Sequence, residues 1–116
     1  MLNGQDSADA ALLRIRLNIV RHMYKITLTC YGVPKAAGLE AAIDITKEFS
    51  EHRKWHTNVS CQWDGERLVL EAENDHDPNG LALLDEFSDC ISAYITEPFD
   101  GDIKVENIIK RGESSA

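Results

Sequence analysis

Two short stretches of alternating side chains, joined at Asp64 and Gly65, constrain the fold of this chain more than any other feature. The segments VSCQW (59–63) and LVLEA (68–72) each place an apolar or small residue at every second position. Alternation with period two predicts strands that bury one face and expose the other. Asp and Gly tolerate the positive φ angles of a two-residue type I′ turn. The sequence therefore predicts an antiparallel hairpin centred on these two residues.

An amphipathic helix is predicted on each side of the hairpin. The first begins at Pro34, which suits the first turn of a helix, and runs to about Ser50. Its apolar stripe is predicted to contain Ala36, Leu39, Ala42, Ile43, Thr46 and Phe49. The second has Asp77 as its N-cap and Pro78 at its first position. Its stripe is predicted to contain Leu81, Leu84, Phe87, Ile91, Tyr94 and Ile95.

Two further strands complete the pattern. Residues 23–31 alternate between apolar and polar side chains, and Ile103, Val105 and Ile108 indicate a short last strand. The order strand–helix–strand–strand–helix–strand is typical of the split βαβ, or ferredoxin-like, arrangement. With right-handed crossovers, this α+β pattern predicts a four-stranded antiparallel sheet with both helices on one face.

The predicted domain spans residues 23–111. Residues 1–22 are expected to form a partly disordered N-terminal extension, and residues 112–116 a loose tail. Within the extension, residues 12–20 favour a helix by composition, although their alternation also fits a strand. Met23 is an alternative start of the chain.

Composition and charge narrow the class of protein. The chain has 116 residues, with 12 Lys and Arg against 20 Asp and Glu, giving a net charge of −8. Such a surface repels phosphate backbones, so neither nucleic acid nor an anionic membrane is an expected partner.

The sequence shows no signal peptide or transmembrane stretch, which favours the cytoplasm. The three cysteines share no CxxC spacing and are expected to be buried free thiols.

The polar side of the predicted sheet and an acidic run beside it form the leading candidate surface. Residues 64–89 contain nine acidic residues and one basic residue, Arg67. Opposite potentials speed encounter and exclude wrong partners, so we expect a protein partner, with basic character, or a small molecule. The same sheet face is also a natural homodimer surface. The residues assigned to this surface are Thr27, Thr29, Tyr31, Ser60, Gln62, Glu71, Glu73, Asp85, Glu86 and Asp89.

A calcium or magnesium site is an alternative. The segment 75–86 (DHDPNGLALLDE) fits the EF-hand loop pattern, with oxygen ligands from Asp75, Asp77 and Asn79. However, the preceding segment is a predicted strand, and Pro78 stiffens the loop. Capping of the following helix accounts for the same residues without a metal. No other cofactor is expected.

The only basic cluster follows the first predicted helix and comprises His52, Arg53, Lys54 and His56. It is a candidate site for a small anion or for zinc. Cations near a helix C-terminus are also favoured by the helix dipole, with no ligand required.

Catalysis is a third possibility, which the sequence favours less. Glu71 and Glu73 lie on the polar side of one strand and could act with a neighbouring Lys or His. That hypothesis requires a concave site over the sheet and a carboxylate of raised pKa. No set of catalytic residues is recognisable, so we expect a binding module and not an enzyme.

Overall fold

The computed structural model describes residues 20–114, which form an α+β fold. The strands are β1 (Val20–Tyr31), β2 (Thr57–Trp63), β3 (Leu68–Asn74) and β4 (Asp102–Ser114). The helices are α2 (Lys35–His52) and α3 (Leu81–Tyr94). The predictions for residues 1–19, which include all but the last residue of the helix-or-strand alternative for 12–20, lie outside the described residues. Residues 20–22, predicted in the N-terminal extension, belong to β1.

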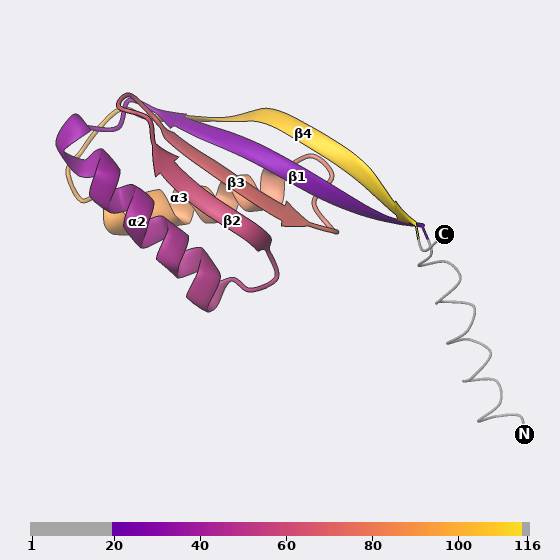
Figure 1. Cartoon of the computed structure of the whole chain (residues 1–116). Helices are drawn as coiled ribbons and strands as arrows, with labels where there is room; N and C mark the ends of the chain where they lie inside the picture. The colour runs from indigo at the N-terminus through magenta and orange to yellow at the C-terminus, as the bar shows by residue number, and fades with distance from the viewer. Residues whose placement is uncertain (1–19, 115–116) are drawn as a thin grey trace, which may run out of the picture.

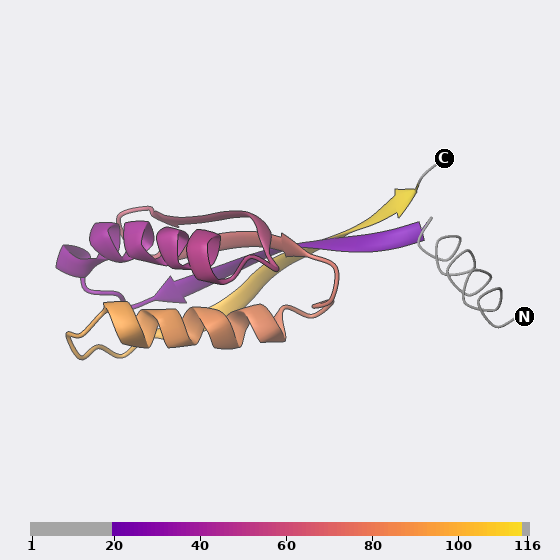
Figure 2. The same cartoon turned by 90° about the horizontal axis from the view of Figure 1, so that it is seen from below.

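The four strands form one antiparallel sheet in the order β2-β3-β1-β4 (Figure 1). Both helices lie in front of the strands when the molecule is seen from below, so they cover the same face (Figure 2). The prediction of a four-stranded antiparallel sheet with two helices is confirmed.

The outer parts of β1 and β4 form a two-stranded arm. Strand β3 pairs with β1 only from Tyr24 onward, whereas β4 pairs with β1 from Val20. The paired segments 20–23 and 111–114 therefore extend beyond the rest of the sheet (Figure 1). Strand β4 is also longer than the short strand expected, and residues 112–114, expected in a loose tail, pair with β1.

The core lies between the sheet and the helices. Ile26 and Leu28 of β1, Leu70 of β3, Phe49 of α2 and Phe87 of α3 are all fully buried. Each strand contributes alternate side chains to this core, as the period-two pattern predicted. Neither described helix combines the length and apolar character needed to cross a membrane.

The buried stripe of α2 differs from the predicted one. Leu39 and Ile43 are 64% and 60% exposed, whereas Gly38, Ala41, Ala42, Ile45 and Phe49 are buried. The reason is close packing: a Cβ atom on Gly38 would lie 2.2 Å from the ring of Trp63. The small residues therefore allow α2 to pack closely against the sheet, and the larger apolar residues Leu39 and Ile43 remain exposed to solvent.

The start of α3 also differs from the prediction. The helix begins at Leu81 and not at Pro78, after Gly80 with φ of +75°. The N-cap residue is Gly80 and not the predicted Asp77, which lies three residues earlier. The Asp77 carboxylate nevertheless accepts hydrogen bonds from the backbone N–H groups of Ala82 (3.2 Å) and Leu83 (2.9 Å) in the first turn of α3. Leu81 and Tyr94, predicted in the apolar stripe, are exposed.

The hairpin turn is displaced by one residue. Asp64 N donates to Arg67 O at 3.1 Å, so Gly65 and Glu66 are the central residues. A type I′ turn needs positive φ at both central positions, and only Gly65 has one, at +99°. The Asp64 carboxylate closes the turn by accepting hydrogen bonds from the N–H groups of Glu66 and Arg67.

The three cysteines are free and buried, as the sequence predicted. Burial raises the thiol pKa of Cys61 to about 12 and those of Cys30 and Cys90 to about 11. We expect none of the three to react with a thiol reagent in the native protein at pH 8, and all three to react in denaturant. Rapid native labelling of any of them would contradict this packing.

Candidate functional site

The face of the sheet opposite the helices is covered by no helix or loop of residues 20–114. We call it the open face. It carries every strand residue predicted for the partner surface, because these positions alternate with those that face the core. Thr29, predicted to be available to a partner, is nevertheless buried, with 2% of its surface exposed. Cross-strand neighbours include Thr27 with Glu71 and Gln62 with Val69. Its polar members include Thr27, Thr29, Tyr31, Ser60, Gln62, Glu71, Glu73, Lys104 and Glu106.

A connected network of polar side chains is centred on Tyr31. The Tyr31 hydroxyl donates to Glu106 Oε2 at 2.8 Å and accepts from Arg67 Nη1 at 2.9 Å. Arg67 also donates through Nε to Asp64 Oδ2 at 2.8 Å. Two cations lie over the Tyr31 ring, with Arg67 Cζ at 5.6 Å and Lys104 Nζ at 5.4 Å from its centre. The tyrosine side chain therefore contacts one carboxylate and two cations.

Glu106 joins this network through an irregularity in β4. Thr27 pairs with Asn107 and Leu28 with Val105, so Glu106 is the extra residue of a β-bulge. Its carboxylate accepts hydrogen bonds from Thr29 Oγ1 (2.7 Å) and from the Tyr31 hydroxyl. These two donors lower the pKa of Glu106 below its ordinary value of 4.5. A lowered pKa keeps the Glu106 carboxylate ionised near neutral pH, whereas a general acid must carry a proton there.

This lowered pKa predicts a pH dependence of stability. Because the folded-state pKa lies below 4.5, the charged carboxylate contributes stability above that value. The contribution is lost as the pH falls through the folded-state pKa. We therefore expect the free energy of unfolding of wild type to fall more steeply below pH 4.5 than that of Glu106→Gln. Equal slopes in urea titrations of the two proteins would contradict the hydrogen bonding of Glu106.

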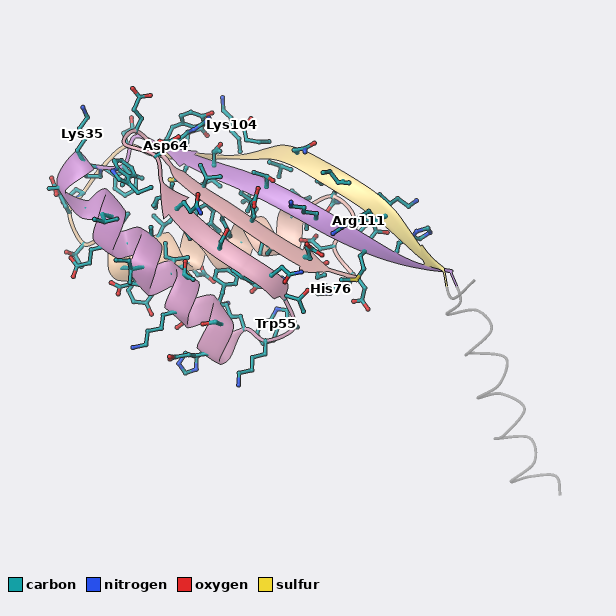
Figure 3. All side chains as sticks on the ribbon, viewed as in Figure 1. Lys35, Trp55, Asp64, His76, Lys104 and Arg111 are labelled. Atoms are coloured by element: carbon teal, nitrogen blue, oxygen red, sulfur yellow. The ribbon has the colours of Figure 1, made fainter. Side chains whose placement is uncertain are left out.

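A recess of about 400 Å³ lies on the open face near the arm. Glu73 and Arg111 line it and form an ion pair, with Arg111 Nη2 2.8 Å from Glu73 Oε1. Figure 3 shows Arg111 at the start of the arm and Asp64 and Lys104 at the opposite end of the sheet. The open face thus has a charged group of residues at each end.

The acidic helix residues predicted for the partner surface do not join the open face. Asp85, Glu86 and Asp89 lie on α3, which packs on the other side of the sheet. Glu86 is instead the centre of an internal cluster. Its carboxylate accepts from Trp55 Nε1 (3.2 Å) and Arg53 Nη1 (3.4 Å), and it contacts His56 Nε2 at 3.1 Å.

The hydrogen bonds around His56 define its tautomer. The Asn74 amide oxygen accepts from the backbone N–H groups of His76 and Asp77, so the amide nitrogen must face His56 Nδ1, 3.2 Å away. Nδ1 is therefore an acceptor, and the ring proton lies on Nε2, directed at Glu86. The imidazole side chain is fully buried. This cluster joins the segment after α2, the end of β3 and α3.

This cluster also accounts for the basic residues proposed as an anion or zinc site. Arg53 and His56 both contact Glu86, and Arg53 Nε lies 3.3 Å from Glu48 Oε2. His52 and Lys54 are exposed. The structure therefore does not gather the four residues around one point. His52 Nε2 lies 3.9 Å from Glu51 Oε1, so three of the four already contact an acidic side chain of the protein.

The loop proposed for calcium or magnesium is engaged in backbone hydrogen bonds. Asp77 is buried and accepts hydrogen bonds from the first turn of α3 with both carboxylate oxygens, and Asn79 Oδ1 accepts from Leu81 N at 3.2 Å. Within residues 20–114, no group of three His, Cys, Asp or Glu side chains is arranged to hold a metal ion. Asp75 is exposed.

The sequence reasoning missed three contributors to these clusters. Arg67 and Arg111 were not assigned to the open face, and Asn74 was not linked to His56. The sequence did contain one signal of the bulge in β4. Ile103 and Val105 are two residues apart, but Val105 and Ile108 are three apart, which indicates one extra residue in the strand. No local signal pairs Glu86 with His56, because 30 residues separate them.

Comparison of the chain with models of known protein families, with curated proteins and with solved structures gave no significant match. The function must therefore be inferred from the residues of this chain.

Proposed function

We propose that this protein is a cytoplasmic, non-enzymatic binding module that receives a protein partner on its open face. The observation that carries the proposal is the Tyr31 network, a hydrogen-bonded group of aromatic, cationic and carboxylate side chains on a face that no described element covers. We also propose that the fold is of the ferredoxin-like type. The element order βαββαβ and the strand order β2-β3-β1-β4 support that assignment.

The residue types favour a protein partner. Tyrosine and arginine are enriched among the residues that dominate binding energy at protein interfaces. Tyr31 and Arg67 are already fixed by hydrogen bonds to Glu106 and Asp64, so less side-chain freedom is lost on binding. A small ligand is the alternative occupant, and the recess beside Glu73 and Arg111 supports it.

The charge of the molecule favours a basic partner. The net charge is −8, and long-range attraction between opposite charges raises the association rate. Such attraction is screened over about 10 Å at 0.1 M salt and about 3 Å at 1 M salt. Partner binding is therefore expected to weaken strongly with salt.

The test is capture of a partner from the cytosol of the native host, followed by affinity measurements on the purified pair. Wild type is compared with Tyr31→Ala, Arg67→Ala and Lys47→Ala, the last an exposed residue of α2, which lies on the other side of the sheet (Figure 2). We expect Tyr31→Ala to weaken binding roughly 30-fold, the effect of a strong interface residue. Lys47→Ala should bind like wild type.

Two results would oppose the proposal. One is equal affinity of all four proteins for the captured partner, which would move the interface away from the open face. The other is binding that survives 1 M salt unchanged, which would remove the electrostatic part of the account.

A further inference from the structure

An open recess of about 380 Å³ lies between α3, the loop that follows it and the start of β4. This loop is seen at the lower left of Figure 2. The recess is distinct from the open face, because it lies on the helix side of the sheet. Its apolar lining comes from Cys30, Ile91, Ile95, Phe99 and Ile103. Its volume is within the range of pockets that bind small molecules.

The wall of this recess is held in place by close backbone contacts. Gly32 has φ of +84°, and a Cβ atom there would lie 2.5 Å from the carbonyl oxygen of Asp100. A Cβ atom on Gly101 would lie 2.4 Å from the Phe99 ring and 3.2 Å from the Tyr31 carbonyl oxygen. The loop therefore packs directly against the end of β1, and the recess is formed before any ligand arrives.

The polar lining defines the charge of a ligand. Ser88, Ser92 and Thr96 supply hydroxyl groups, and Glu97 is the charged lining residue. Within the described part of the chain, no hydrogen bond or ion pair occupies the Glu97 carboxylate. Asp102 lies close enough for its charge to help raise the pKa of Cys30. Asp102 is itself paired with Lys104 at 3.8 Å, so Glu97 is the uncompensated negative charge at the recess, and a cation is electrostatically favoured there.

We propose that this recess binds a small organic cation, with an apolar body against Ile91, Ile95 and Phe99 and an ammonium group at Glu97. Burial of the apolar body supplies most of the affinity, because it removes apolar surface from water. The ammonium–carboxylate contact at the rim is partly solvated, so it contributes selectivity more than affinity. This inference is independent of the open face and its partner.

The experiment uses phenethylammonium as the probe, with 3-phenylpropionate and 2-phenylethanol as probes of similar shape and different charge. Binding is followed by amide chemical shifts of the isotope-labelled full chain. We expect phenethylammonium to shift signals of the recess, phenylethanol to bind about threefold more weakly, and phenylpropionate to bind least. Glu97→Gln should remove the preference for the ammonium compound and leave phenylethanol binding unchanged.

A variant with a bulky side chain in the recess distinguishes binding there from binding to other surfaces of the protein. Ser92→Trp places a large side chain in the recess and should abolish binding of all three probes. Ser60→Trp, the matched change on the open face, should leave it intact. Equal binding of the three probes to wild type, shifts confined to other surfaces, or unchanged phenethylammonium binding by Ser92→Trp would each overturn the proposal.

Discussion

Replacing His56 with alanine is expected to lower the free energy of unfolding by roughly 3–5 kcal/mol, the cost of removing one partner from a buried polar pair. The imidazole is fully buried and packs against Phe49, with ring centres 5.5 Å apart. Its loss leaves a cavity, removes the partner of the Asn74 amide nitrogen and removes one of the three partners of Glu86. Urea unfolding followed by circular dichroism measures the change.

Glu86→Gln is the matched control for this prediction. A glutamine carbonyl still accepts the His56 Nε2 proton at the same place, so we expect a loss of only about 1 kcal/mol. If His56→Ala costs no more than Glu86→Gln, the cluster around His56 is not a major source of stability.

Replacing Gly32 with alanine is the second change with a large expected effect, roughly 3–4 kcal/mol. Its φ of +84° is unfavourable for any residue with a Cβ, and the added atom would also overlap the Asp100 carbonyl group at 2.5 Å. Because that neighbour is backbone, the loop must move to relieve the overlap. Thermal or urea unfolding gives the loss of stability.

Gly65→Ala separates the cost of the positive φ angle from the cost of the steric overlap with Asp100. Gly65 has a similar φ of +99°, but an added Cβ would meet no atom within 4 Å. We expect a loss of about 1–2 kcal/mol from backbone strain alone. Equal losses for the two variants would mean that the contact between Gly32 and Asp100 contributes nothing.

The sheet was predictable because period two is a local property of the sequence. The alternation in residues 59–63 and 68–72 located β2 and β3 within two residues of their observed bounds. The helices were predictable in position, but the buried side of α2 was not. A periodicity argument ranks positions by how apolar their side chains are, whereas α2 packs through Gly38 because that residue has no side chain to collide with Trp63.

The candidate site was predictable only in part. The alternation of side chains along the strand placed Thr27, Thr29 and Tyr31 on one face, which the structure confirms. The alternation could not link Tyr31 to Glu106, because 75 residues separate them and the bulge in β4 changes which residues of that strand face the open side. The acidic run from residue 64 to 89 was read as one surface, but the crossing from β3 to α3 divides it between the two sides of the sheet.

The most direct test of the central claim is site-specific photo-crosslinking in the native host, with benzoylphenylalanine in place of Gln62 or of Leu39. Gln62 is exposed on the open face, whereas Leu39 is exposed on α2, on the opposite side of the molecule. The account predicts a discrete crosslinked partner from position 62 and none from position 39. Crosslinking from position 39 alone would contradict it and would assign the interface to the helices.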